Sequence, residues 1–427
     1  MKSKVFKNAS WIIGCKLVKA FLMLIVTMIS ARYLGPSNYG LISYAASLIA
    51  FVTPIMKLGL ESTLVYEIVN NPLKEGKIVG TSIVMNILSG ILCLIGVCTF
   101  TFFVNAGETE TLIICALYGI SLLFQALEMI QYWFQSKLLS KYSAMSMLIS
   151  YIIVSILQVV ILLTNKNLYL FCLTYSLDFL LIAIFLLVIY KNKGTQKLSF
   201  SFKIGKKMLN KSKYYIISTM MVTIFAQTDK IMLKMMLDNS SVGYYTAGNT
   251  CATMFAFVFA AILDSFRPIV FEAKKKSNEA FQDQMKKLYS ILIYFSLLIC
   301  LLSTIFSPLI IKIMYGKEYS LAIPVLRVVV WYTTFSYLGS ARNIWVMAEE
   351  KQKYLWIMNL SGAIINIILN LILIPVYKIV GAAIASLITQ IFTNIIIGFI
   401  IKPIRENNKL MIQALDIRNL KNIFFSQ

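Results

Sequence analysis

Long apolar segments, separated by short polar connections, recur along the whole sequence. A helix needs about 20 apolar residues to cross a hydrocarbon core of about 30 Å. Twelve such segments occupy residues 11–34, 39–58, 78–104, 111–135, 142–164, 168–190, 213–237, 242–270, 288–314, 321–347, 355–375 and 379–401. Because a backbone in lipid must satisfy its own hydrogen bonds, helices are the natural spanning elements here. The sequence therefore predicts an all-α, polytopic membrane protein with twelve transmembrane helices.

The positive charge is distributed unevenly between the connections. If the N-terminus is cytoplasmic, the outer connections hold only Lys166, Lys312, Lys317 and Lys378, and most other basic residues lie inside. This bias predicts that both termini are cytoplasmic. The net charge of +22 is then mainly a topology signal that also favours contact with anionic membrane lipids. No soluble basic domain interleaved with aromatic residues is present, so nucleic acid is not an expected partner.

The longest hydrophilic connection, residues 191–213, follows the sixth apolar segment. It predicts two six-helix bundles, residues 1–200 and 201–401, as in transporters built from repeats. An offset of 203 residues also aligns Leu34 and Gly40 with Leu237 and Gly243, which favours a parallel duplication. Residues 402–427 alternate basic and apolar side chains, and we expect this tail to lie along the cytoplasmic membrane surface.

Composition argues against catalysis and against a metal centre. The seven cysteines all fall in apolar segments without metal-type spacing, so we interpret them as packing residues. The sequence has no histidine, the commonest acid, base and metal ligand near neutral pH. We therefore predict a protein that is not an enzyme and that has no cofactor, apart from a coupling proton or sodium ion.

Two lysines lie inside the first apolar segment. Lys16 and Lys19 are one turn apart and share a helix face. A charge at mid-membrane costs roughly 2.5–3.5 kcal/mol, so this pair requires water or an anion. Further cations, Lys230, Arg327 and Arg342, lie in the seventh and tenth segments. One phosphate charge about 4 Å from an ammonium gains roughly 4 kcal/mol at an effective dielectric near 20, so we predict a cationic cavity that binds an anionic headgroup.

Uncharged and acidic polar residues form stripes on two other segments. The fourth segment carries Gln125, Glu128 and Gln131 at helical spacing, and the eleventh carries Asn359, Asn366 and Asn370. Such residues either line a polar cavity or join helices by hydrogen bonds of about 1 kcal/mol each, and both interpretations stand.

Two acidic residues in the apolar segments are candidates for coupling. Asp178 lies near the middle of the sixth segment and Asp229 lies in the seventh. An intramembrane carboxylate is a functional candidate by default, and the alternative for Asp178 is a structural pair with a lysine. Asp264 and Arg267, one turn apart, are expected to form a self-contained ion pair.

Four stretches carry a resemblance to a known family: ARYLGPSNYG (31–40), YWFQ (132–135), QTDKIML with VGYYTAG (227–233 and 242–248), and NIILNLILIPVYKIVGAAIASLIT (366–389). The sequence resembles bacterial polysaccharide flippases, the Wzx-type O-antigen and capsule exporters of the multidrug/oligosaccharidyl-lipid/polysaccharide (MOP) superfamily.

The resemblance implies two six-helix bundles arranged in a V around a cationic cavity, with alternating access. It implies movement of an undecaprenyl-pyrophosphate-linked oligosaccharide from the cytoplasmic to the outer leaflet of the bacterial inner membrane. Lys16 and Lys19 would line the N-terminal wall of the cavity, and Lys230 or Arg327 the C-terminal wall. The implied partners are the lipid-linked glycan, membrane lipids and the polysaccharide polymerase and assembly machinery.

Other functions fit the residues less well. A multidrug cation antiporter of the same superfamily fits the helix count, but cationic drugs favour an acidic cavity. A membrane glycosyltransferase or polymerase would need catalytic acids in a sizeable loop, and paired carboxylates occur only at Glu349 and Glu350. Lipid II flippases of the superfamily usually carry two more spans.

Overall fold

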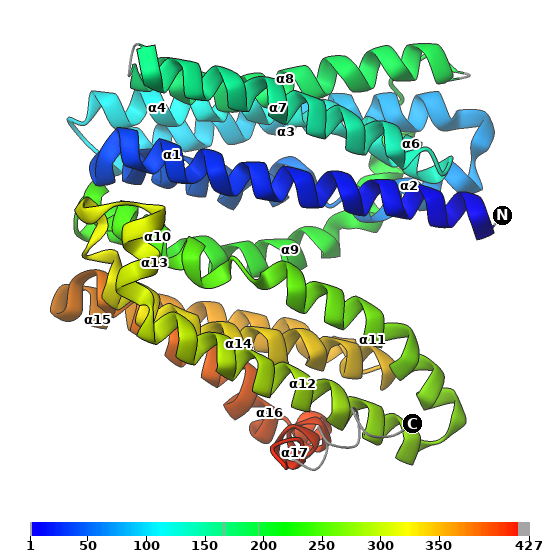
Figure 1. The fold of residues 1–427 in the computed structure, drawn as a ribbon. Coiled ribbons are helices and arrows are strands. Elements are labelled where there is room, and N and C mark those ends of the chain that lie inside the picture. The colour runs from blue at the N-terminus through cyan, green and yellow to red at the C-terminus, as the bar shows by residue number, and fades with distance from the viewer. Residues whose placement is uncertain (1, 165–166, 195, 417–427) are drawn as a thin grey trace. The chain divides into compact units, whose positions relative to one another are not determined.

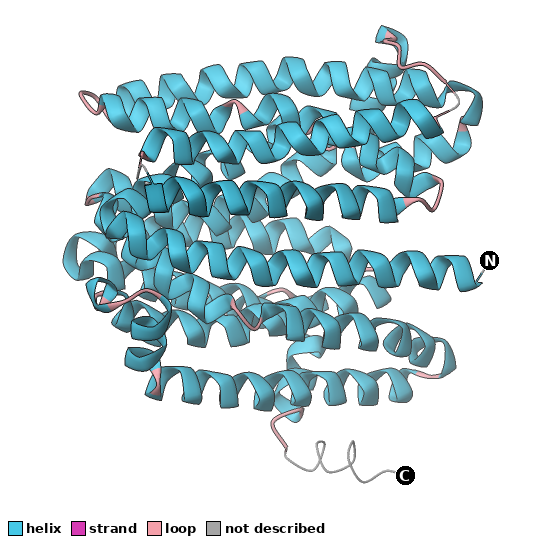
Figure 2. Cartoon of the chain, turned by 45° about the horizontal axis from the view of Figure 1, so that its top comes forward, coloured by secondary structure: helices cyan, strands magenta, loops and turns pink. Residues whose placement is uncertain are grey.

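The computed structural model describes residues 2–164, 167–194 and 196–416. Within these ranges the chain is helical with short connections and contains no strand (Figure 2). The predicted all-α class is therefore confirmed. The chain divides into two compact units, unit 1 (Met1–Gln227) and unit 2 (Thr228–Gln427).

Unit 1 consists mainly of long helices connected in sequence order (Figure 1). Its elements are α1 (Lys2–Met56), α2 (Glu61–Asn70), η1 (Pro72–Lys74), α3 (Glu75–Val104), α4 (Thr109–Gly119), α5 (Ser121–Gln125), η2 (Ala126–Met129), α6 (Ile130–Ser136), α7 (Ser140–Thr164), α8 (Leu168–Lys193) and the first part of α9 (Phe202–Met236). Helix α7 packs against both α1 and α8.

Unit 2 begins within α9 and contains a second set of helices. Its further elements are α10 (Asn239–Thr253), α11 (Ala256–Lys276), α12 (Asn278–Ile305), α13 (Ser307–Met314), η3 (Lys317–Tyr319), α14 (Ala322–Ala348), η4 (Gln352–Tyr354), α15 (Leu355–Ile391), η5 (Phe392–Ile396), α16 (Ile397–Ile400), η6 (Lys402–Ile404) and α17 (Arg405–Gln413). Helix α14 packs against α10, α12 and α15.

Two of the longest helices are interrupted where two predicted spans meet. In α1, Gly35 has a φ of 73° and precedes Pro36, which separates the spans predicted at 11–34 and 39–58. A positive φ is readily adopted by glycine, and a following proline disfavours helical backbone. In α15, Lys378 (φ 51°) separates the last two predicted spans, three residues after Pro375.

Eight helices in the described ranges are long and apolar enough to cross a membrane, or nine if α10 and α11, bent by 41°, form one span. Counting α1 and α15 as two spans each, α10 with α11 as one, and α14, which is not among these apolar helices, as a further one gives the predicted twelve. Two predicted segments are each divided between two helices: 242–270 between α10 and α11, and 288–314 between α12 and α13. The Ser277 side chain caps the start of α12 by accepting from the Ala280 amide at 3.1 Å, and Pro308 lies in the first turn of α13.

The division between the units lies 27 residues after the predicted boundary at residue 200. The first turns of α9 pack into unit 1, because Met208 is buried in a cluster with Leu64, Ile68, Trp133 and Phe134. The hydrophilic stretch after α8 is therefore partly helix packed on α2 and α6, and not only a linker.

The start of the predicted C-terminal tail packs into unit 2. Met411 of α17 is buried against the core of α12 and α14. The Tyr289 hydroxyl donates to Asn407 at 2.6 Å, and Ser290 donates to the Ala414 carbonyl at 2.7 Å. Residues 417–427 of the predicted tail lie outside the described residues.

Candidate functional site

A pocket of about 240 Å³ in unit 1 brings together several of the predicted site residues. It is bounded by α1, α6 and α7, and its polar lining consists of Lys16, Lys19, Gln131, Gln135, Ser140 and Ser143. The lysine face of the first span and the glutamine stripe of the fourth span thus meet around one space. Ammonium and amide donors in such a space suit a ligand with both negative charge and hydroxyl groups.

Lys19, which lines this pocket, has an acidic partner that does not line it. Its ammonium lies 3.9 Å from a carboxylate oxygen of Asp178 on α8 and 5.1 Å from the ring centroid of Tyr151. Asp178 also accepts a hydrogen bond of 2.6 Å from Ser150. The structure therefore supplies the lysine partner that was one of the two interpretations of Asp178.

The two lysines differ in their surroundings. The Lys19 side chain is 30% exposed, and it is paired with Asp178, whose side chain is 14% exposed. Lys16 is exposed, and among the described residues no carboxylate lies within 4.0 Å of its ammonium. An incoming anion would therefore meet one cation without an ion-pair partner and one with an internal counterion.

A second charged group in unit 1 was missed at the level of sequence. Lys57 and Glu61 form an ion pair of 3.0 Å, and the Tyr132 hydroxyl donates to Glu61 at 3.2 Å. The separation of four residues between Lys57 and Glu61 is a signal for such a pair, but the helix break after Met56 obscures it. Glu128, which is 8% exposed, interacts electrostatically with both Lys57 and Lys19.

The fourth span is not a continuous α-helix at its polar stripe. Glu128 lies in η2, a 3₁₀ segment between α5 and α6, where the backbone is more tightly wound. A 3₁₀ stretch inside a helix often marks a hinge or a strained sequence. Gln125 is buried and donates to Ser121 of its own span at 3.3 Å, so its amide serves its own helix and the pocket lining begins at Gln131.

Unit 2 holds a buried carboxylate with a different set of partners. Asp229 of α9 is 5% exposed and accepts from the side-chain amides of Asn370 at 2.7 Å and Asn366 at 3.2 Å. It also accepts from the hydroxyls of Tyr245 on α10 and Ser386 on α15. Four neutral donors therefore surround one carboxylate, and within the described ranges no ammonium or guanidinium lies within 4.0 Å of it.

The asparagine stripe thus joins helices, because Asn366 and Asn370 bind Asp229 across the α9–α15 contact. Asn359 is half-buried and lies two turns earlier on α15, outside this cluster. Tyr245 and Ser386 were not predicted, although both belong to stretches that carried the family resemblance.

The remaining predicted cations lie in unit 2, and each has different neighbours. Arg342 is 4% exposed and donates to the Thr393 carbonyl at 2.6 Å, so its guanidinium is committed to the interior of the unit. Arg327 is exposed and donates to Ser307 at 2.9 Å. Lys230 is half-buried beside Asp229 in sequence. The predicted pair of Asp264 and Arg267 is confirmed at 3.5 Å.

The comparison with protein families decides the assignment. A family model described as "Polysaccharide biosynthesis protein" matches residues 5–274, more than half of the chain. The chain belongs to this polysaccharide biosynthesis protein family. A second model, MatE, matches residues 215–372 of this family member.

Solved structures share the fold of this polysaccharide biosynthesis protein. One is named "Lipid II flippase MurJ, inward closed conformation", with a TM-score of 0.72 and 18% identity, covering 97% of this chain and 92% of that chain. Another is an inward-facing multidrug resistance MATE family transporter of the MOP superfamily, with a TM-score of 0.68 and 12% identity, covering 93% and 96%. The expected MOP fold is therefore confirmed.

A curated relative is the uncharacterized membrane protein MJ1068 of Methanocaldococcus jannaschii, 27% identical over 228 residues. The match covers 49% of this chain and 44% of that protein, less than half of each. Together with the apolar helices, these relationships establish a multi-pass membrane protein.

Proposed function

We propose that the protein moves an undecaprenyl-pyrophosphate-linked oligosaccharide repeat unit from the cytoplasmic to the outer leaflet of the bacterial inner membrane. The glycan would then serve the synthesis of a surface polysaccharide such as O-antigen or capsule. The family match and the fold shared with a named lipid flippase support transport of a lipid-linked glycan. The observation that carries the proposal is the pocket with Lys16 and Lys19 beside amides and hydroxyls.

The pocket offers each polar part of such a substrate a suitable contact. The lysine ammonium groups bind the pyrophosphate, since charge-assisted hydrogen bonds to phosphate are roughly twice as strong as neutral ones. Gln131 and Gln135 donate to and accept from sugar hydroxyls. The polyprenyl tail stays in the lipid, because only the polar portion needs the pocket.

Binding of the pyrophosphate competes with the Lys19–Asp178 pair. The ion pair is 3.9 Å long, so an anion can replace Asp178 as the nearest counterion of Lys19. Asp178 then keeps its hydrogen bond from Ser150. Asp178 is the counterion of Lys19 when the pocket is empty, and the pyrophosphate replaces it when the substrate binds.

Asp229 is the stronger candidate for coupling to an ion gradient. Among the described residues its buried carboxylate accepts hydrogen bonds from neutral donors, and Lys230 interacts with it electrostatically without forming an ion pair, so a proton or a sodium ion would be the first positive charge in direct contact with it. The side-chain oxygens of Asn366, Asn370, Tyr245 and Ser386 are hard ligands of the kind that such cations prefer. If the lysines move together with the substrate, their positive charges cancel its negative charges. The membrane potential, worth about 2.3 kcal/mol per charge per 100 mV, then gives no driving force, and an antiported cation is required.

A multidrug cation antiporter is the second candidate, and the MatE match over residues 215–372 is the observation that favours it. The lysines of the unit 1 pocket argue against this function, because an organic cation there would meet two ammonium groups. Selective binding of ethidium, without binding of polyprenyl pyrophosphate, would support the antiporter.

Export of surface polysaccharide tests the proposal. In cells whose own flippase is deleted, we compare the wild-type chain with Lys16→Ala and Lys19→Ala at matched membrane levels. Lys191→Ala, which changes an exposed lysine at the end of α8, is the control. We expect export from wild type and control, and loss of export with accumulated lipid-linked precursor in the two pocket variants. Unchanged export in both pocket variants would contradict the role of the pocket.

A further inference from the structure

A second cavity in unit 1 is also lined by lysines. It has a volume of about 310 Å³ and lies among α2, η1, the start of α3 and the start of α9. Its charged and hydroxyl lining consists of Lys74, Lys77, Lys203, Lys207, Glu67 and Ser201. Four ammonium groups and one carboxylate leave an excess of three positive charges, and none of these residues lines the Lys16–Lys19 pocket.

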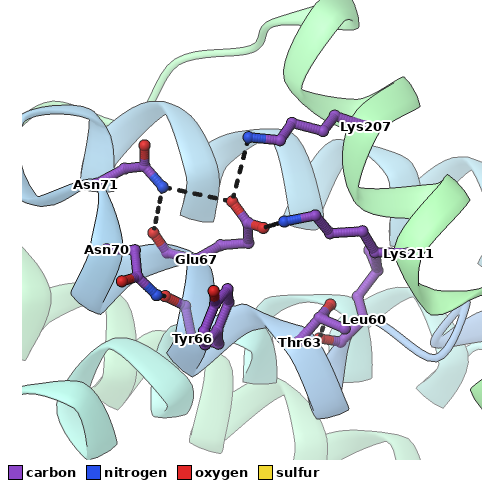
Figure 3. Close-up of polar contacts among 8 residues, drawn as sticks. All are labelled: Leu60, Thr63, Tyr66, Glu67, Asn70, Asn71, Lys207 and Lys211. Carbon is purple, nitrogen blue, oxygen red and sulfur yellow. Dashed lines mark hydrogen bonds and ion pairs between the residues drawn. The ribbon is translucent and has the colours of Figure 1, made fainter.

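The single carboxylate of this cavity is already occupied. Glu67 is 4% exposed and forms ion pairs with Lys211 and with Lys207, the latter at 4.0 Å, and Asn71 donates to it at 3.4 Å (Figure 3). The hydrogen bond with Glu67 raises the pKa of Lys211 above its ordinary value, so this lysine stays charged. Glu67 therefore links α9 to α2, and its negative charge is neutralised by lysines of α9.

The other three lysines have no such compensation. Lys74, Lys77 and Lys203 are exposed, and the described part of the chain places no carboxylate within 4.0 Å of them. They come from η1, α3 and the start of α9, and the Glu67 ion pairs hold the start of α9 against α2. Three ammonium groups around one space repel one another, and an anion with several oxygens relieves that repulsion.

Large apolar side chains are exposed next to these lysines. Leu73, adjacent to Lys74, is 89% exposed, and Phe202, adjacent to Lys203, is 77% exposed. Tyr66 and Val69 of α2 are also exposed. Apolar side chains interleaved with lysines are typical of segments that lie in the membrane interface, where the apolar groups enter the acyl boundary and the lysines reach the headgroups.

We propose that this cavity binds the phosphate-bearing headgroup of an anionic lipid in the cytoplasmic leaflet. The lysines contact the phosphate, and Leu73 and Phe202 lie against the acyl chains. The apolar residues distinguish a lipid from a soluble phosphate, which would gain nothing from them. This site does not depend on which substrate the Lys16–Lys19 pocket carries.

Binding of lipids to the purified full-length protein tests the site. Native mass spectrometry would titrate phosphatidylglycerol against phosphatidylcholine for the wild type and for the triple variant Lys74→Gln/Lys77→Gln/Lys203→Gln. The control Lys275→Gln/Lys276→Gln/Lys353→Gln removes the same charge from exposed positions of unit 2. We expect the cavity variant to weaken phosphatidylglycerol binding by about tenfold to 100-fold and the control by less than about twofold. Equal weakening in both would overturn the proposal.

Two further measurements separate the sources of the phosphate. Leu73→Ser/Phe202→Ser should weaken lipid binding and leave binding of inorganic pyrophosphate unchanged. If binding of undecaprenyl pyrophosphate depends on the same lysines, the site is supported. The proposed transport substrate is then one of the lipids that bind in this cavity. Lysine-dependent binding of inorganic pyrophosphate without lysine-dependent binding of either lipid overturns the proposed site. Thermal unfolding of each variant checks that the fold is intact, and the export assay shows separately whether transport survives.

Discussion

Asp229 of unit 2 and two carboxylates of unit 1 are compensated in different ways. In unit 1, Asp178 and Glu67 both have lysine partners, and each lies near or within a pocket lined by lysines. In unit 2, Glu349 also has lysine partners, but Asp229, which is 5% exposed, accepts from neutral amides and hydroxyls and has no ammonium within 4.0 Å among the described residues. A carboxylate held by lysines can be displaced by another anion, whereas one held by neutral donors is open to a cation. The difference supports the proposed recognition of an anion by unit 1 and the proposed coupling to a cation by unit 2.

The largest expected effect on stability comes from Asp229→Ala. This change leaves several buried donors without an acceptor, at about 1–3 kcal/mol for each, so we expect a loss of at least about 3 kcal/mol. Thermal unfolding in detergent measures it. The control Asp264→Ala removes a carboxylate whose side chain is 70% exposed and should cost less than about 1 kcal/mol. Equal losses for the two variants would mean that the neutral donors do not stabilise the native Asp229 carboxylate.

A double variant decides whether Lys19 serves Asp178 or the substrate. We expect Lys19→Gln to lower export at least about tenfold, because a phosphate contact is lost. Lys19→Gln/Asp178→Asn should be equally impaired, since removing the internal counterion does not restore the missing cation. Recovery of export in the double variant would instead make the ion pair purely structural. Precursor accumulation, measured at matched protein levels, reports both results.

Tyr132→Phe should have a smaller effect. It removes one hydrogen bond to Glu61, which keeps its ion pair with Lys57, so we expect a loss of about 1 kcal/mol. Tyr169→Phe, at an exposed tyrosine on α8, is the control and should change stability by less than about 0.5 kcal/mol. A loss as large as that of Asp229→Ala would contradict the expectation that Lys57 still compensates Glu61 when the Tyr132 hydroxyl is removed.

The smallest effect is expected from Lys211→Met and should depend on pH. The pKa of Lys211 is raised by its hydrogen bond with Glu67, so the stabilisation is present at neutral pH and is lost as the pH rises above the ordinary lysine value of 10.5. The difference in unfolding temperature between wild type and variant should therefore shrink only in that alkaline range. If the difference in unfolding temperature already shrinks below pH 9, the titration of a group other than Lys211 causes it.

Helical periodicity accounts for what the sequence could predict. The apolar segments matched helices, and the spacing of three residues between Lys16 and Lys19 placed both on the face that meets Gln131 and Gln135. The spacing of four residues likewise placed Asn366 and Asn370 on one face. Periodicity fixes which residues share a face of their own helix, and these predictions needed nothing more.

Partners from distant segments required the structure. Asp178 meets Lys19 across 159 residues of sequence, because packing of α7 between α1 and α8 brings the three helices together. Nothing local to Asp178 shows that partner. The hydrophilic start of α9 was interpreted as a linker because its lysines dominate the composition, although Met208 and Lys211 fix it to α2. The buried position of Arg342 also depends on neighbours that its own helix does not reveal.

Unit 1 is proposed to bind the anionic substrate, and unit 2 is proposed to couple its movement to a cation. Proteoliposomes containing a labelled undecaprenyl-pyrophosphate oligosaccharide test both roles directly, by transfer between leaflets with and without a proton or sodium gradient. We expect wild-type transfer to accelerate with one gradient, Lys19→Gln to be slow in every condition, and Asp229→Asn to match wild type only without a gradient. Transfer that is insensitive to Lys19→Gln but abolished by Asp229→Asn in the absence of a gradient would contradict the assignment.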